Sequence, residues 1–80
     1  MKLYVGNFNY MTTVPELKKL FAEQGFVLNV RIVHDQFTRQ SKCFGFVNMI
    51  NTKDGNKAIE ALHGKNLKNH RLIVKKAKKI

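Results

Sequence analysis

The chain has 80 residues and a formal charge of +10, with 15 Lys and Arg against 5 Asp and Glu. This size allows one domain with a modest core, and the charge favours a polyanionic partner, either nucleic acid or an anionic membrane surface. No apolar run approaches the ~18 residues of a membrane span, and we expect no signal peptide. The single cysteine excludes an internal disulfide, and the three histidines lack metal-ligand spacing. We therefore expect no metal and no cofactor.

The first strand is predicted over residues 2–6. Because side chains alternate along a strand, Lys2 and Tyr4 lie on one side and the aliphatic residues on the other. A loop follows this strand. We expect Phe8 and Tyr10 to be anchors packed beneath that loop.

The first helix is predicted over residues 13–24. Thr13 and Glu16 have the spacing of a capping box, in which the glutamate reaches back to the cap. The residues of its apolar stripe recur at intervals of three and four. They are Leu17, Leu20 and Phe21.

The second strand is predicted over residues 26–33. Neither of its faces is fully polar, and by analogy with the other strands we expect Val30 and Ile32 to face the core and Arg31 to face outward. A polar connection follows, in which Phe37 stands alone. That ring either folds back onto the domain or lies free to meet a base.

The third strand is predicted over residues 42–50, and its two sides differ in chemistry. One side carries Lys42, Phe44 and Phe46. The other is small or aliphatic, with Cys43, Gly45, Val47 and Met49. A soluble protein rarely exposes two neighbouring rings without a use for them, and rings beside a cation suit flat bases on a negative backbone. The alternative is that both rings are core residues of a strand buried on both sides.

The second half of the chain repeats the pattern of the first. A helix is predicted over residues 53–63, and Asn51-Thr52 can cap it. The last strand is predicted over residues 71–76. Leu72 and Val74 share one of its sides.

The C-terminal quarter is basic and has no acidic residue from position 61 onward. Its cations are Lys65, Lys68, Arg71, Lys75, Lys76, Lys78 and Lys79. Because such a run has no counterions, a phosphate-facing role is favoured over a merely solvated face. We expect residues 1–77 to form the domain and residues 78–80 to be a basic tail.

The order of elements predicts an α+β, ferredoxin-like βαββαβ fold. Two similar halves interleave into a four-stranded antiparallel sheet, and both helices pack on the same face. The other face can then stay open to solvent. The residues expected there are Lys2, Tyr4, Arg31, Lys42, Phe44, Phe46, Ile73 and Lys75.

The chain resembles the RNA recognition motif family over nearly its whole length. Leu3–Phe8 looks like the hexapeptide motif of that family on the first strand. Lys42–Met49 looks like its octapeptide motif on the third strand. Leu72, Val74 and Ala77 look like its last-strand pattern.

Three positions depart from the family pattern. Cys43 stands where a glycine is usual, and strand alternation directs it toward the helices or the edge of the strand. Met49 replaces an aromatic residue that faces the core, where methionine is an adaptable filler. Arg39 stands where the connection between the middle strands commonly has a glycine.

The resemblance implies that Tyr4 and Phe46 each stack a base and that Phe44 lies against sugars or stacks as well. The expected phosphate contacts are Lys2, Arg31, Lys42, Lys75 and Lys78. Single-stranded RNA is the implied ligand, and single-stranded DNA is the alternative because stacking ignores the 2′-hydroxyl. We expect a monomer in the cytoplasm, with the nucleus as the alternative compartment.

Three other interpretations were weighed. A domain of this kind can serve as a protein-interaction module with little RNA binding, but such domains often lack the platform rings. The same fold hosts small phosphate-handling hydrolases, yet the loop over residues 6–13 has no arginine, and we expect no enzyme activity. Cold-shock barrels carry a similar Phe-Gly-Phe run, but they have no helices.

Overall fold

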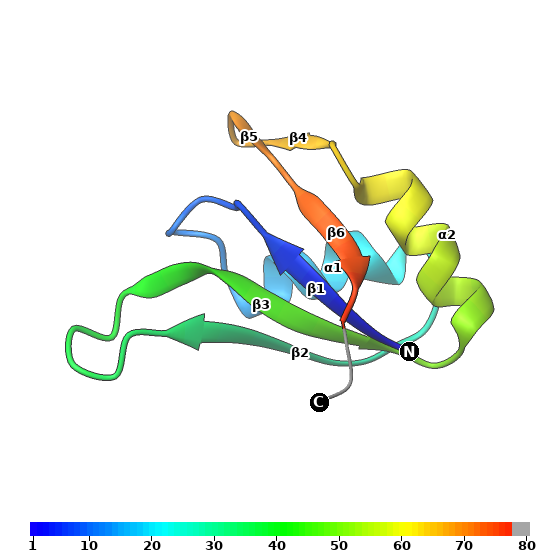
Figure 1. The fold of residues 1–80 in the computed structure, drawn as a ribbon, viewed down its shortest axis with the longest axis horizontal. Coiled ribbons are helices and arrows are strands. Elements are labelled where there is room, and N and C mark those ends of the chain that lie inside the picture. Colours follow the sequence, from blue (N-terminus) through cyan, green and yellow to red (C-terminus); the bar gives the residue numbers. More distant parts are fainter. Residues whose placement is uncertain (78–80) are drawn as a thin grey trace.

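The computed structural model describes residues 1–77, and it contains two helices, a four-stranded sheet and a small two-stranded hairpin (Figure 1). The elements are β1 (Lys2–Gly6), α1 (Val14–Ala22), β2 (Val27–His34), β3 (Ser41–Met49), α2 (Thr52–Leu62), β4 (Asn66–Leu67), β5 (His70–Arg71) and β6 (Ile73–Lys76). The predicted basic tail and Lys78 lie outside the described residues.

The main sheet has the strand order β2-β3-β1-β6, and every neighbouring pair is antiparallel. β1 and β3 are therefore the central strands. Tyr4 pairs with Phe46 on one side and with Lys75 on the other. Directly opposite residues in antiparallel strands project from the same face. This register therefore places Phe46, Tyr4 and Lys75 side by side on one face of the sheet.

Both helices cover one face of this sheet. Leu17 and Phe21 of α1 and Ala58 and Leu62 of α2 are buried in a single core. The strands contribute the alternate residues that point toward the helices, which are Leu3, Val5, Val27, Ile32, Val47, Met49 and Val74. The ferredoxin-like arrangement is thus confirmed, and the opposite face of the sheet is left without a helical cover (Figure 1).

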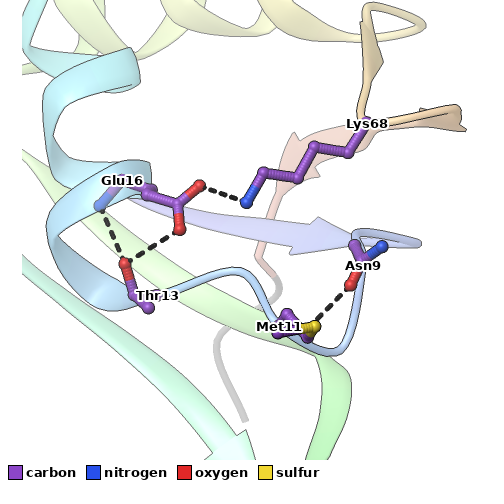
Figure 2. A network of polar contacts seen from close by, with 5 residues as sticks. All are labelled: Asn9, Met11, Thr13, Glu16 and Lys68. Atoms are coloured by element: carbon purple, nitrogen blue, oxygen red, sulfur yellow. Dashed lines mark hydrogen bonds and ion pairs between the residues drawn. The ribbon is translucent and has the colours of Figure 1, made fainter.

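The start of α1 is fixed by the predicted capping contacts. Thr13 Oγ1 accepts a hydrogen bond from the backbone N–H of Glu16 at 3.4 Å, and its hydroxyl donates to Glu16 Oε1 at 3.2 Å. Figure 2 shows Lys68 reaching from the β4–β5 turn to the same carboxylate, at 2.6 Å. The Lys68 hydrogen bond lowers the pKa of Glu16. Lys68 is therefore paired on the helical side, although the sequence includes it in the basic run.

The β4–β5 hairpin is an element that the sequence pattern did not predict. Asn66 pairs with Arg71, and Leu67 pairs with His70. The two residues between the strands, Lys68 and Asn69, both have positive φ angles, of 52° and 68°. Two such residues in succession form the tight turn that matches the twist of a hairpin.

The alternation of β2 is broken near its start. The pairing with β3 shifts between Val27 and Asn29, so Leu28 is an extra residue at this point. Val27 is consequently buried, whereas Leu28 is 56% exposed. Beyond this bulge Val30 and Ile32 face the core and Arg31 is exposed, as predicted.

A second irregularity separates Lys42 and Cys43 from the regular part of β3. Ile32 pairs with Gly45, but His34 pairs with Ser41, so β3 has extra residues here. Cys43 has a φ of 63° and is partly buried, and its N–H donates to Ser41 Oγ at 3.0 Å. This left-handed backbone is the conformation that glycine adopts without penalty. The backbone at this point is therefore not a regular strand, so strict alternation does not apply at Cys43.

The loop aromatics differ from one another in burial. Phe8 is buried in the core, as expected, but Tyr10 is 66% exposed, so its assignment as an anchor is wrong. The backbone N–H of Thr12 donates a hydrogen bond to the carbonyl of Asn9, which closes a turn, and Thr12 is buried near the start of α1. Phe37 is 84% exposed, which excludes the alternative in which it folds back onto the domain.

Candidate nucleic-acid interface

The uncovered face of the sheet carries the three predicted rings in adjoining positions. Tyr4 lies directly opposite Phe46 across the β1–β3 pair, and Gly6 lies opposite Phe44. The ring centroids of Tyr4 and Phe44 are 5.8 Å apart with an angle of 27° between the planes. Phe46 meets both rings edge to face, at 6.1 Å from Tyr4 and 6.3 Å from Phe44. All three are half-buried, so each ring keeps surface available to a ligand.

The three rings are held together by their own contacts. Offset and edge-to-face pairs at these separations stabilise one another by about 0.5–1.5 kcal/mol each. No helix covers them, and we call Tyr4, Phe44 and Phe46 the ring platform. The interpretation of Phe44 and Phe46 as core residues of a doubly buried strand is therefore wrong.

Two lysines lie over the ring platform. Lys2 Nζ is 4.6 Å from the centroid of the Phe46 ring, and Lys75 Nζ is 5.3 Å from the centroid of Tyr4. A cation within about 6 Å of a ring face is attracted by the ring quadrupole. The two ammonium groups therefore stay beside the rings while remaining exposed.

Two glycines of the motif strands allow this geometry by close approach. A Cβ on Gly6 would lie 2.6 Å from Tyr4 Oη, so the Tyr4 ring occupies the space above Gly6. A Cβ on Gly45 would collide with the backbone carbonyl oxygen of Arg31 on β2. Gly6 therefore positions a ring of the platform, whereas Gly45 allows β2 to approach β3.

The other predicted phosphate contacts are less uniformly placed. Arg31 is exposed and lies opposite Phe46, so it borders the platform on the β2 side. Lys42 is exposed in the irregular start of β3, where its charge adds to the backbone hydrogen bonds of Thr38 and Phe37 that lower the pKa of Asp35. The structure does not bring Lys42 into the paired rows that hold the rings, and Lys78 lies outside residues 1–77.

Asp35 shapes the connection between β2 and β3. Its carboxylate accepts hydrogen bonds from the backbone N–H groups of Thr38 at 3.0 Å and Phe37 at 2.8 Å. These two bonds lower the pKa of Asp35. Arg39, which stands where glycine is common, has a φ of 62° and donates its N–H to the carbonyl of Asp35 at 2.8 Å. The loop is thus closed into a defined turn that holds the exposed Phe37 ring.

Sequence reasoning missed two asparagines on the same open face. Asn29 of β2 pairs with Asn48 of β3, and Asn48 lies opposite Lys2 of β1. Asn48 Nδ2 donates to Asn29 Oδ1 at 2.9 Å. A hollow of about 350 Å³ opens here, lined by Lys2, Asn29, Val30, Arg31, Phe46 and Asn48. Asn48 follows Phe46 by two positions, so alternation alone places it on the platform face.

Other chemistry is not assembled in this part of the chain. Among residues 1–77, no three His, Cys, Asp or Glu side chains are grouped in a way that could hold a metal ion. Neither helix of that segment is long and apolar enough to cross a membrane.

Comparison with known proteins agrees with this geometry. The family model of the RNA recognition motif matches residues 3–73. The chain is 42% identical to the putative RNA-binding protein RbpA of Nostoc sp. over 78 residues, which cover 98% of this chain and 76% of that protein. It is 41% identical to the chloroplastic RNA-binding protein CP31B of Arabidopsis thaliana over 73 residues, covering 91% of this chain but 25% of CP31B.

The fold comparison leads to the same family. The crystal structure of RNA binding protein PG1 superposes with a TM-score of 0.95 at 38% identity, covering 100% of this chain and 96% of that one. The sheet order, the ring positions and the match over residues 3–73 agree. The chain belongs to the RNA recognition motif family.

Proposed function

We propose that this chain binds single-stranded RNA on the open face of its sheet, with Tyr4, Phe44 and Phe46 as the stacking surface. The observation that carries the proposal is the ring platform itself, whose centroids lie 5.8–6.3 Å apart on the face without helices. Bases of a single strand are unstacked and can lie on such rings, whereas a duplex hides them. The names of RbpA, CP31B and PG1, all described as RNA-binding, support the same ligand.

The rings supply the sequence-tolerant part of the affinity. A base stacked on an aromatic side chain contributes roughly 1–3 kcal/mol by alanine substitution. Two or three such stacks, reduced by the cost of ordering a flexible strand, correspond to binding near the micromolar range. In this proposal the protein holds the strand without catalysing a reaction.

The cations supply a salt-dependent part. Lys2 and Lys75 lie over platform rings, and Arg31 borders Phe46 on the β2 side. Lys42 and Lys78 remain proposed phosphate contacts from the sequence. With about four phosphates paired, the logarithm of the affinity should fall with the logarithm of salt concentration at a slope of about −3 for a single strand.

The proposal covers a monomeric domain over residues 1–77 that prefers RNA and also accepts single-stranded DNA through stacking. CP31B is a chloroplastic protein, and this chain spans a quarter of its length. The cytoplasmic location expected from the sequence stays a prediction. Measuring sedimentation of the free chain tests the monomer, and competition by DNA of matched sequence tests the ligand preference.

The experiment that tests the proposal compares a phenylalanine of the ring platform with one that lies away from it. Phe46 lies on the platform, whereas Phe26 is exposed beside α1 and borders a separate hollow with Lys18 and Ala22. Phe46→Ala should weaken binding of a short randomised RNA by about 1–3 kcal/mol, measured by fluorescence anisotropy. Phe26→Ala should leave the affinity unchanged. Equal affinities of the two variants, both folded by circular dichroism, would refute the platform.

A further inference from the structure

We propose that the Asn29–Asn48 pair reads the edge of the base that stacks on Phe46, and so sets the sequence preference of this site. The inference rests on the proposed function and assigns a role to a feature that the ring platform does not use. Both asparagines lie on the open face, and Phe46 is the neighbour of Asn48 two positions back on the same strand. A base that stacks on Phe46 therefore extends its edge toward the neighbouring positions on the same face, which Asn48 and Asn29 occupy.

The hydrogen-bond inventory of the pair fits this role. One N–H of Asn48 donates to Asn29 Oδ1 at 2.9 Å, which fixes the two amides relative to each other. Within residues 1–77, no other protein group bonds Asn48 Oδ1 or the Nδ2 group of Asn29. Each amide carries two donors and an accepting oxygen, so the pair keeps an accepting oxygen on Asn48 and N–H donors on Asn29 for a ligand.

Base edges carry both donors and acceptors, which the remaining amide groups of the pair can bond. Asparagine forms paired hydrogen bonds to base edges, and one well-formed pair discriminates against a wrong base by roughly five-fold to 150-fold. Single-stranded RNA exposes the edges that such pairs need. A mutual hydrogen bond also reduces the freedom that each amide would otherwise lose on binding. The amides are therefore prepared to read a base.

The surroundings provide space and charge for a nucleotide. The hollow of about 350 Å³ is open to solvent and lined by Lys2 and Arg31 as well as by the amides and Phe46. Lys2 Nζ lies 4.6 Å from the Phe46 centroid, on the β1 side, and Arg31 lies opposite Phe46 on the β2 side. One nucleotide thus meets a ring for its face, two amides for its edge and two cations for its phosphate.

The test measures discrimination rather than affinity alone. Dissociation constants are determined by fluorescence anisotropy for short homopolymers of adenosine, cytidine and uridine. They are measured for the unmodified chain and for the Asn48→Leu variant. The whole chain should discriminate between the best and the worst homopolymer by about ten-fold or more, and Asn48→Leu should bring the three affinities to within a few-fold of one another. Asn29→Thr, a substitution at an exposed strand position, should have the same effect.

Asn56→Leu is the matched control, because Asn56 is exposed on α2 and lies away from the open face. It should keep the discrimination of the unmodified chain. Unchanged discrimination in both Asn48→Leu and Asn29→Thr, or a chain that binds all three homopolymers equally, would overturn the inference while leaving the proposed function standing. A chain that binds none of them would overturn both.

Discussion

The two faces of the central strands have opposite purposes, although their residues alternate along the same backbone. Leu3, Val5 and Val47 point toward the helices and are fully buried. Tyr4 and Phe46, their immediate neighbours, point away and are only partly buried, so each keeps some surface in contact with solvent. Along β1 and β3, stability therefore depends on one set of alternate residues and ligand binding on the other. A substitution can change one of these properties without the other.

The largest expected effect is on the covered face. Leu3→Ala should lower the free energy of unfolding by about 2–5 kcal/mol, because a fully buried leucine leaves a cavity on truncation. Urea unfolding monitored by circular dichroism measures this loss. RNA affinity of the folded fraction should stay as in the unmodified chain. A loss within about 0.5 kcal/mol, typical of surface positions, would contradict the assignment of Leu3 to the core.

The next largest effect is a loss of RNA affinity from a substitution on the open face, with little change in stability. Gly6→Ala places a methyl group 2.6 Å from the present position of Tyr4 Oη, so the Tyr4 ring must turn aside. The free end of that side chain can move, so stability should change little, while RNA affinity should fall by about 1 kcal/mol as part of one stack is lost. Calorimetric titration with a short uridine oligomer measures the affinity. An affinity equal to that of the unmodified chain would show that Tyr4 is not positioned by Gly6.

A smaller effect concerns charge. Lys75→Ala removes the ammonium group that lies 5.3 Å from the Tyr4 centroid. If Lys75 contacts one phosphate, the salt slope of RNA binding should become shallower by about 0.7. Lys57→Ala is the control, since Lys57 is exposed on α2 and its removal changes the net charge equally. Identical slopes for the two variants would mean that only net charge matters.

The smallest effect is that of pH on the helical side. The Lys68 hydrogen bond lowers the pKa of Glu16, so the folded state favours the carboxylate more than the unfolded state does. That stabilisation is present above the unfolded pKa and is lost as the pH falls through the lowered folded pKa. Urea midpoints should therefore drop on acidification, and Glu16→Gln should show a smaller drop. An identical drop in both proteins would assign the acid sensitivity to other carboxylates.

Much of this arrangement follows from sequence periodicity. Alternation placed Tyr4, Phe44 and Phe46 on the side opposite the core, and the capping pair Thr13 and Glu16 located the start of α1. These predictions succeed because a sheet with helices on one face leaves each strand a period of two.

The misses occur where the backbone departs from regular geometry. The bulge at Leu28 and the left-handed backbone of Cys43 each interrupt the alternation of side chains. The pattern of apolar residues in the sequence does not indicate where a strand contains an extra residue. Tyr10 was assigned by residue type, but the backbone turn closed by Thr12 leaves it exposed. The Asn29–Asn48 contact depends on which residues of two strands lie opposite each other, and that register is a tertiary property.

The most direct test of the central claim is an amide chemical-shift titration of the chain with a short randomised RNA. The account predicts that the largest changes fall on β1 and β3, at and around Tyr4, Phe44 and Phe46, with smaller changes at Asn29 and Lys75 on the flanking strands. The amides of α1 and α2 should change little, because both helices lie on the other face. Changes concentrated on the helices, or none on the two central strands, would contradict it.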